Sequence, residues 1–223
     1  DYIFPTSYAG FAGNSLVAPD SAHLMYAGAA TSKATITNAM PMDLTLIERA
    51  VTKASTLGGG TSGIPAIEPI KIDGEERYVL VMHPFQAHAL RNNSSTGQWL
   101  DIQKALATAV GNKSPIFVGG MGFHRGVVLH EHRAVIRYSD YGAGSNLAAA
   151  RALFMGRQAG VVAFGSPGTG LRFDWHEESR DNGNQAVITT SSIFGVKKTA
   201  FTIDGTSRDF GLFSLDTYAV DPA

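Results

Sequence analysis

The order of helix-like and strand-like segments is the feature that most restricts the fold of this chain. Apolar residues recur with a helical period in two long segments, residues 42–57 and 96–110. The segments between them favour strands, and the last third of the 223-residue chain has strand signals alone. Because helices and strands do not alternate in a regular strand-helix-strand rhythm, we expect an α+β protein.

The segment Met42–Leu57 has the clearest helix signals. Asp43 is a candidate for the N-cap, and Met42 and Ile47 have the spacing of a hydrophobic staple. An apolar stripe predicts that one side of this helix packs on a sheet or on another helix. The members of the stripe are Leu44, Ile47, Val51 and Ala54.

Turn residues divide the remaining apolar runs into strands. Asp73–Gly74 predicts a β-hairpin whose second strand, Arg77–Met82, is apolar enough to be central. Pro84 is expected to open a short helix at residues 85–90. The Ala-rich segment Asn146–Phe154 is interpreted as helical, with Ser145 as its cap. Further strands are expected at residues 115–118, 126–138, 160–164, 173–178, 186–192, 196–203 and 210–219.

Residues 1–40 contain several aromatic side chains without a helical or alternating order. Such a segment cannot cover its own rings, so it is interpreted as an extended arm that lies on another surface. That surface is either its own domain or another chain, and the sequence leaves both open. The candidate subunit-contact residues are Tyr2, Phe4, Tyr8 and Phe11.

Composition excludes several classes of protein. The chain has no Cys, which rules out disulfides and Cys-based metal sites and suits a reducing cytosol. With 18 Lys and Arg against 19 Asp and Glu, the net charge of −1 lacks the positive field of a dedicated nucleic-acid binder. No apolar run reaches the roughly 18 residues that cross a bilayer, so no membrane contact is expected.

His130 and His132 are the residues that most resemble a catalytic site. On a continuous strand they would point the same way and could hold one metal, as in a cupin. No carboxylate follows at the spacing that would complete such a set, so half-buried structural histidines are the preferred interpretation. The acidic residues Asp174, Glu177, Glu178 and Asp181 are interpreted as a solvated or inter-subunit edge. The sequence therefore predicts no enzyme activity, no metal and no cofactor.

Several segments, taken in order, resemble the major capsid proteins of tailed bacteriophages, in particular the Enquatro-type family of the coliphage N-four capsid. The segments that carry the resemblance cover most of the chain between Ala27 and Ala219. They are Tyr78–Gln86, Gly97–Gln103, Pro115–Gly122, Gly126–His132, Ala150–Ala159, Trp175–Glu178 with Asp181, Ile193–Lys198, and Asp209–Gly211 with Tyr218.

The resemblance implies the Hong Kong 97 (Johnson) capsid fold. It implies an N-terminal arm and extended-loop region at 1–41, a peripheral domain with a spine helix at 42–77, an axial domain at 78–170, and a return to the peripheral sheet at 171–223. Family members have a longer N-terminal portion than this chain. The implied role is a structural subunit of an icosahedral head shell enclosing double-stranded DNA.

The partners that the resemblance implies are copies of the same chain in hexamers and pentamers, together with scaffold, portal and decoration proteins. Contact with packaged DNA would be independent of base sequence, through dispersed basic residues such as Lys104, Arg125 and Arg151. The expected location is the virion, after assembly in the bacterial host cytoplasm. Two other hypotheses remain: a metal-dependent cupin-like enzyme using His130 and His132, and a β-rich binding module formed by the last third.

Overall fold

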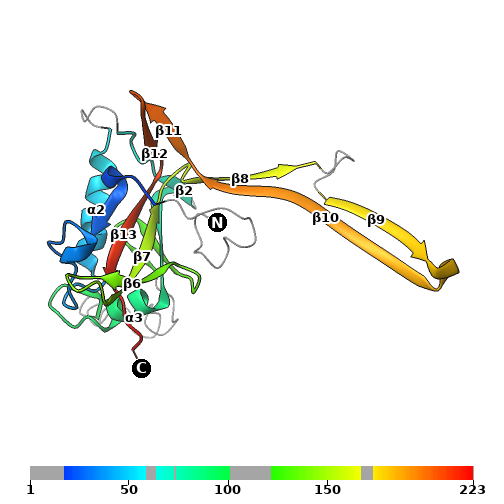
Figure 1. Cartoon of the computed structure of the whole chain (residues 1–223). Coiled ribbons are helices and arrows are strands. Elements are labelled where there is room, and N and C mark those ends of the chain that lie inside the picture. Colours follow the sequence, from blue (N-terminus) through cyan, green and yellow to red (C-terminus); the bar gives the residue numbers. More distant parts are fainter. Residues whose placement is uncertain (1–17, 59–63, 73, 101–121, 167–172, 223) are drawn as a thin grey trace. The chain divides into compact units, whose positions relative to one another are not determined.

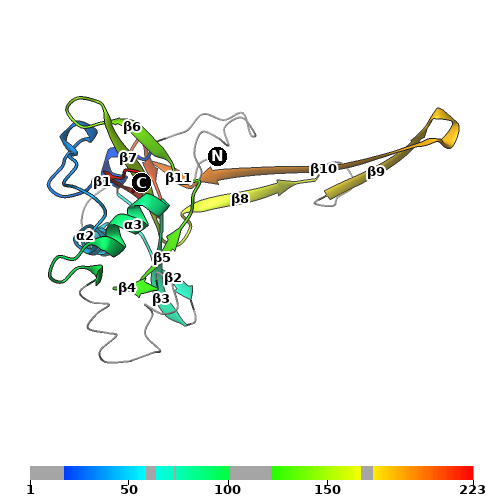
Figure 2. The same cartoon turned by 90° about the horizontal axis from the view of Figure 1, so that it is seen from below.

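The computed structural model describes residues 18–58, 64–72, 74–100, 122–166 and 173–222 (Figures 1 and 2). The chain divides into two compact units, the first formed by residues 1–159 with 198–223 and the second by residues 160–197. Among the described residues, the α-helices are α2 (Leu44–Thr56) and α3 (Pro84–Asn92), and short 3-10 turns lie at Ser21–His23, Lys33–Thr35 and Asp181–Gly183.

The described strands of the first unit belong to two sheets. Their bounds are β1 (Leu24–Tyr26), β2 (Ile70–Ile72), β3 (Glu75–Met82), β4 (Phe123–His124), β5 (Val127–Glu131), β6 (Arg137–Tyr141), β7 (Leu147–Met155), β11 (Ala200–Ile203), β12 (Thr206–Asp209) and β13 (Leu212–Tyr218). The larger sheet has the order β1-β13-β7-β3-β5-β4, with β2 paired to β3 and β6 to β7. The pairs β1–β13 and β3–β5 are parallel and the other printed pairs are antiparallel. The mixture of helices with this sheet confirms the α+β expectation.

Helix α2 forms where the sequence predicts it. The Asp43 carboxylate accepts a hydrogen bond from the Leu46 N–H at 2.8 Å, which satisfies one of the free donors of the first turn. Met42 and Ile47 are both fully buried, in agreement with the predicted staple. The buried side of the helix is wider than the predicted stripe, because Leu46 and Ala50 are buried as well.

The apolar side of α2 belongs to one hydrophobic cluster with a face of the large sheet. Leu80 of β3 lies opposite Phe154 of β7, which in turn lies opposite Phe213 of β13. The rings of Phe154 and Phe213 stack with centroids 4.6 Å apart. All three side chains are fully buried, so this face of the sheet is the core of the first unit.

The hairpin and the short helix are also confirmed. Residues 70–72 pair with the start of β3, whose position between β7 and β5 makes it the predicted central strand. Pro84 occupies the first turn of α3, and the His83 ring accepts a hydrogen bond from the Phe85 N–H at 3.2 Å. Neither described helix is long and apolar enough to cross a membrane.

Two predictions about the middle of the chain are wrong. Residues 147–155 form strand β7 rather than a helix, because β13, β3 and β6 all pair with this segment. Tertiary pairing outweighs the helix propensity of its alanines. Residues 126–138 are not one strand, since β5 ends at Glu131 and a turn follows in which the Val135 N–H donates to the His132 carbonyl at 3.2 Å.

Most strands of the last third agree with the sequence, and one short strand near the start is new. β1 pairs with β13 although the sequence suggests only an irregular arm there, because three residues are too few to show a period. Gly211, between β12 and β13, has a φ of +71°, and a Cβ at this position would lie 2.3 Å from the Arg157 carbonyl oxygen. Glycine is therefore required where the chain enters β13. The predicted elements at 101–110 and 115–118 lie outside the described residues.

Candidate assembly surfaces

The second unit is a sheet formed by β8 (Gly160–Gly165), β9 (Phe173–Arg180) and β10 (Gln185–Lys198), with β10 in the middle. The β9–β10 hairpin turns through Asp181 and Asn182, both with a φ of 51°, and Gly183. The register pairs Trp175 with Thr190 and Glu177 with Ile188. The predicted turn at residues 181–184 is confirmed.

Large apolar side chains are exposed on this sheet to an unusual degree. Among the described residues, eight of the eleven exposed large hydrophobic side chains belong to residues 160–197, and each has 43–62% of its surface accessible. They are Val161, Val162, Phe164, Phe173, Trp175, Ile188, Ile193 and Phe194. Contiguous exposed apolar surface of this kind marks a site of protein contact.

Six of these eight side chains share one face of the sheet. Side chains alternate along a strand, and directly paired residues of neighbouring strands point the same way. The register therefore puts Phe173, Trp175 and Ile188 on one face with Phe194. The ring of Phe164 lies 6.2 Å from that of Phe194, which adds Phe164 and, by alternation, Val162. We call this set of six side chains the apolar face.

The opposite face of the hairpin is polar. Alternation places Asp174, His176, Glu178 and Arg180 there, and the Arg180 guanidinium lies 3.0 Å from the Glu178 carboxylate. Glu177 is the acidic residue that shares the apolar face, directly opposite Ile188. The hairpin thus combines an aromatic and aliphatic surface with a negative charge at the same place.

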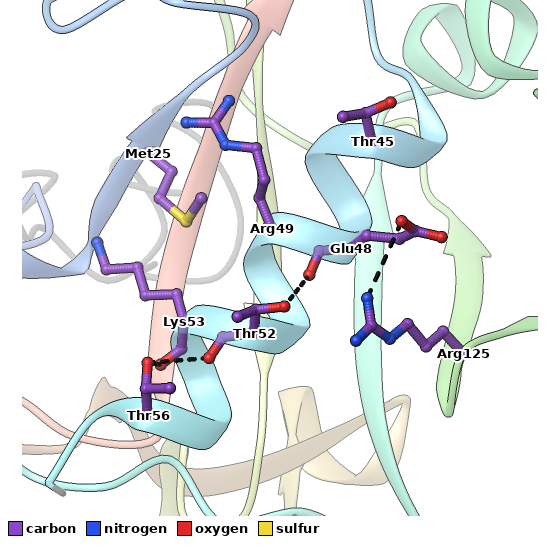
Figure 3. Close-up of a pocket in the computed structure, with 8 residues that line it drawn as sticks. All are labelled: Met25, Thr45, Glu48, Arg49, Thr52, Lys53, Thr56 and Arg125. Carbon is purple, nitrogen blue, oxygen red and sulfur yellow. Dashed lines mark hydrogen bonds and ion pairs between the residues drawn. The ribbon is translucent and has the colours of Figure 1, made fainter.

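A shallow groove of about 460 Å³ runs along the solvent side of α2 in the first unit (Figure 3). Its lining residues are Met25, Thr45, Glu48, Arg49, Thr52, Lys53, Thr56 and Arg125. Arg49 and Lys53 extend toward the side of Met25, whereas Glu48 points toward Arg125, whose guanidinium is 3.9 Å away. The groove therefore has threonine and methionine surfaces together with three cationic groups and one anionic group.

Two cationic side chains, Arg49 and Lys53, lie close together on the Met25 side of the groove. Arg49 and Lys53 are four residues apart on α2, where like charges repel. Burial lowers the pKa of the Lys53 amine, nearby Asp20 raises it in part, and Arg49 lowers it again, so that it lies below its ordinary value. Neither cation forms an ion pair with a carboxylate in the part of the chain that the structure describes.

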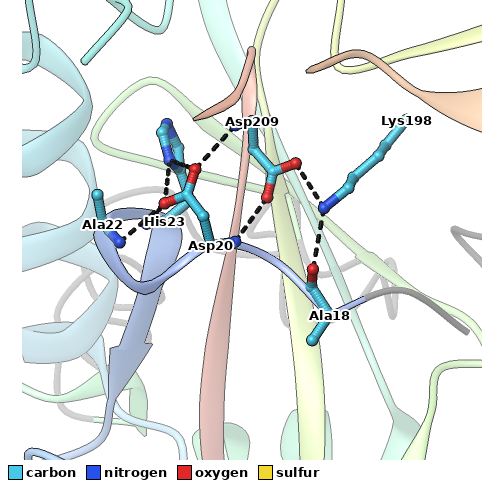
Figure 4. A network of polar contacts seen from close by, with 6 residues as sticks. All are labelled: Ala18, Asp20, Ala22, His23, Lys198 and Asp209. Carbon is cyan, nitrogen blue, oxygen red and sulfur yellow. Dashed lines mark hydrogen bonds and ion pairs between the residues drawn. The ribbon is translucent and has the colours of Figure 1, made fainter. Parts of the chain in front are cut away.

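A polar network fixes residues 18–23 to β12 and to the end of β10 (Figure 4). Asp20 and Asp209 each donate a backbone N–H to the other's carboxylate at 2.8 Å. Lys198 Nζ lies 2.5 Å from the Asp209 carboxylate and donates to the Ala18 carbonyl at 3.0 Å. Burial raises the pKa of Asp20, but hydrogen bonds from Asp209 and His23 lower it, and the net pKa is below the ordinary value. This network anchors the chain that follows residue 17.

A second network lies inside the large sheet. Arg151 of β7 makes a bidentate ion pair with Asp216 of β13, with both N···O distances 2.7 Å, and the Tyr141 hydroxyl donates to the same carboxylate at 2.6 Å. Asp216 is fully buried. The Arg151 side chain is therefore mostly buried in this ion pair, and its contact with DNA stays a prediction. Arg125 is half-exposed, and Lys104 lies outside the described residues.

The histidines proposed as metal ligands do not form the predicted pair. His130 lies on β5, but His132 lies beyond the end of that strand, where its ring accepts a hydrogen bond from the Ala134 N–H at 3.2 Å. His130 is exposed, so the prediction of a half-buried structural residue is wrong for it. Among the described residues, no group of three His, Asp or Glu side chains could hold a metal ion.

The structure brings together surfaces that sequence reasoning does not find. The alternation of Phe173 and Trp175 with polar residues is visible in the sequence, but it does not say that the apolar side stays exposed. The groove of α2 combines residues from three distant segments, so no local signal indicates it. The candidate contact residues Tyr2, Phe4, Tyr8 and Phe11 lie outside the described residues.

Solved structures place this architecture among phage capsid folds. The chain is similar to the capsid of Ralstonia phage GP4, with 51% identity and a TM-score of 0.74, over 100% of this chain and 60% of that one. It also has the fold of the cyanophage Pam1 capsid asymmetric unit, with 18% identity and a TM-score of 0.68, over 89% of this chain and 55% of that one.

The sequence profile of the phage capsid protein family matches residues 4–221, and the chain belongs to this family. A curated relative, the major capsid protein of Pseudomonas phage KPP25, is 32% identical over 115 residues, which are 47% of this chain and 29% of that protein. The chain thus spans less than a third of this curated relative and somewhat over half of the two solved capsid chains.

Proposed function

We propose that this chain forms part of a major capsid protein that self-assembles into the icosahedral head shell of a tailed phage or prophage around double-stranded DNA. Membership of the phage capsid protein family supports the class of function. The observation that carries the proposal is the apolar face of residues 160–197. Each of these side chains has about half of its surface accessible, so covering one contributes about 1 kcal/mol, and a copy gains free energy when neighbouring copies cover this face.

Repeated contacts between identical copies account for both assembly and durability. Head-to-tail contacts close into rings, and the proposed rings are the hexamers and pentamers of the shell. A copy held by several neighbours leaves only when all contacts break together, so each contact can be weak. Tyr2, Phe4, Tyr8 and Phe11 are proposed as additional contacts between copies.

The finer assignments follow from the resemblance. We propose the Enquatro-type subfamily and the Hong Kong 97 fold, with α2 as the spine helix, residues 42–77 and 171–223 in the peripheral domain, and residues 78–170 in the axial domain. The arm region is residues 1–41. Scaffold, portal and decoration proteins are the proposed partners, and packaged DNA is contacted without base specificity. The protein resides in the virion after assembly in the host cytoplasm.

The role proposed is structural rather than catalytic. The strand that would present His130 and His132 together ends at Glu131, which removes the geometric basis of the cupin-like alternative. Capsid relatives support a role in building a shell. No observation of the site favours a second function.

Electron microscopy of the full-length protein, expressed with its scaffold, tests the proposal. Closed shells or ring-shaped capsomers are expected, and light scattering should increase steeply with protein concentration. A protein that remains monomeric at all concentrations and ionic strengths would contradict the proposal. Stoichiometric bound metal together with turnover of a small molecule would instead favour the enzyme hypothesis.

A further inference from the structure

We propose that Asn182, in the turn of the β9–β10 hairpin, is a site of spontaneous covalent modification that converts it into an aspartate linked to the chain through its side-chain carboxyl group. The reactants are the Asn182 carboxamide, the Gly183 backbone nitrogen and water. The inference concerns the chemistry of this turn alone. It is therefore independent of the proposed role in a shell.

The residue that follows an asparagine decides how readily its carboxamide is attacked by the next backbone nitrogen. A Cβ on that residue lies beside the attacking nitrogen and hinders the approach, whereas glycine has no Cβ. Asn182 is followed by Gly183, and each of the seven other asparagines of the chain is followed by a larger residue. The sequence thus singles out Asn182 among the asparagines.

The structure leaves this pair of residues accessible to water. Asn182 and Gly183 are both exposed. Within the part of the chain that the structure describes, no hydrogen-bond partner holds the Asn182 carboxamide. A Cβ added at Gly183 would have only Ser179 Oγ within reach, at 3.9 Å. Little packing therefore opposes a movement of the reacting groups.

The folded turn nevertheless keeps the reacting atoms apart. Asn182 has a φ of 51° and a ψ of 32°. This ψ places the Gly183 nitrogen nearly opposite the Asn182 Cβ about the Cα–C bond, whereas closing a succinimide ring requires the two to lie on the same side. The turn must therefore open before the ring forms. Exposed turns with few apolar contacts open at a low cost in free energy.

The reaction balances with water as the only added reactant. The Gly183 nitrogen loses its proton to solvent and forms a bond to Asn182 Cγ, and the Cγ–Nδ2 bond breaks with release of ammonia. Water then opens the cyclic imide at one of its two carbonyl carbons. Attack at the Asn182 main-chain carbonyl gives the β-linked aspartate, and attack at Cγ gives ordinary aspartate. Both products carry a new negative charge.

The β-linked product alters the end of the hairpin. Its main chain is longer by one carbon, whereas the present turn depends on three successive residues with positive φ, Asp181, Asn182 and Gly183. The new charge also joins an acidic region, since residues 173–184 contain four carboxylates and one arginine. The modification should therefore weaken the pairing of Arg180 with Gln185, which lies next to the turn.

Mass spectrometry of the full-length protein tests the inference. The folded protein is incubated at pH 7 and pH 8.5, below the concentration at which it assembles, and then digested. Enzymatic methylation of the free main-chain carboxylate identifies the β-linked aspartate. We expect this product at residue 182, formed faster at pH 8.5 because the Gly183 nitrogen must lose a proton. Unfolding in urea should accelerate the reaction further, because the turn no longer fixes ψ.

Asn184 is the matched control within the same turn. It is exposed like Asn182, but Gln185 follows it and pairs with Arg180 in the sheet. Its conversion should be at least tenfold slower than that of Asn182. In a separate variant, Gly183→Ala should slow the reaction at residue 182 about tenfold, with circular dichroism to verify that the variant folds.

The turn between β11 and β12 is a second control. Asp204, with a φ of 49°, precedes Gly205 there, so a glycine again follows a residue in a left-handed conformation. The Asp204 carboxylate has no ammonia to release and resists attack when it is charged. At pH 8.5 its conversion to the β-linked form should be at least tenfold slower than that of Asn182.

The possible results separate this inference from the proposed function. An intact Asn182, or conversion no faster than that of Asn184, would overturn the inference. Ordinary aspartate without the β-linked form would show direct hydrolysis and would also overturn it. Equal rates in folded and urea-unfolded protein would contradict the required opening of the turn. Electron microscopy of the assembled protein decides the proposed function, and none of these rates bears on it.

Discussion

Strands β13 and β10 show two ways in which this chain uses a β-sheet. Six of the seven residues of β13 are buried, whereas none of the fourteen residues of β10 is. β13 has strands on both sides and an apolar cluster with α2 on one face. β10 pairs with β8 and β9 and leaves large side chains exposed. The first sheet is stabilised by its own unit, and the second is suited to contact with other chains.

The largest expected difference in stability is between the loss of the Arg151–Asp216 ion pair in the first unit and the loss of the Arg180–Glu178 ion pair in the second. Asp216→Ala leaves the Arg151 guanidinium buried without its partner, and we expect a loss of about 3–5 kcal/mol in the free energy of unfolding. Glu178→Ala removes a pair of which both partners are about half-exposed, and the loss should be below about 1 kcal/mol. Urea denaturation of both variants measures the difference, and equal losses would contradict the comparison.

The next contrast concerns apolar side chains of equal size. Leu215 is fully buried, so Leu215→Ala should cost about 2–5 kcal/mol. Ile188 is 55% exposed, and Ile188→Ala should cost less than about 1 kcal/mol. Thermal and urea unfolding test both values. A cost for Ile188→Ala that matches that of Leu215→Ala would show that the apolar face is already covered within one chain.

A third prediction concerns assembly instead of folding, and here a residue of the second unit is expected to have the larger effect. Trp175→Ala should raise the protein concentration needed for assembly about tenfold, equivalent to about 1.4 kcal/mol. Its free energy of unfolding should remain close to that of the unchanged protein. Val161→Ala, on the opposite face of the sheet, is the control and should shift the assembly concentration less than twofold. Light scattering against concentration measures both, and identical shifts would argue against a specific face.

The smallest expected effect concerns pH and the network at Asp20. The folded-state pKa of Asp20 lies below its ordinary value of 3.8, so its charge stabilises the folded chain above that pH. This contribution is lost as the pH falls from about 4 through the lowered pKa. Asp20→Asn should therefore weaken the decrease in stability below pH 4. Urea unfolding at pH 6, 4 and 3 tests this, and an unchanged pH dependence would exclude a stabilising charge.

Local signals were sufficient for the elements whose ends carry their own caps and turns. Asp43 caps α2, Pro84 opens α3, and Asp73–Gly74 lies between β2 and β3, as the sequence predicts. In each case the deciding contacts lie within a few residues along the chain. The same local reasoning fails for β7, whose sequence favours a helix but whose backbone pairs with β13 and β3, at residues 57 to 76 positions away along the chain.

The candidate site was less accessible to sequence reasoning than the fold. From the sequence, the acidic run of the hairpin indicates a solvated or inter-subunit edge, but the sequence does not say which of these residues share a face with the apolar side chains. Which face of residues 173–194 stays exposed depends on packing, which periodicity does not report. The groove joins Met25, α2 and Arg125, and only the fold brings these segments together.

The chain enters and leaves the second unit at two neighbouring positions, so the sequence of this unit can change independently of the rest of the chain. The chain leaves the first unit after Ala159 and returns by Thr199, and the Thr199 N–H donates to the Ala159 carbonyl at 3.3 Å. Any replacement segment whose ends meet at that spacing can be spliced in without disturbing the rest of the chain. Residues 160–197 therefore form a segment that evolution can replace as a unit, or in which an engineer can display a foreign peptide, while the sheet of the first unit is retained.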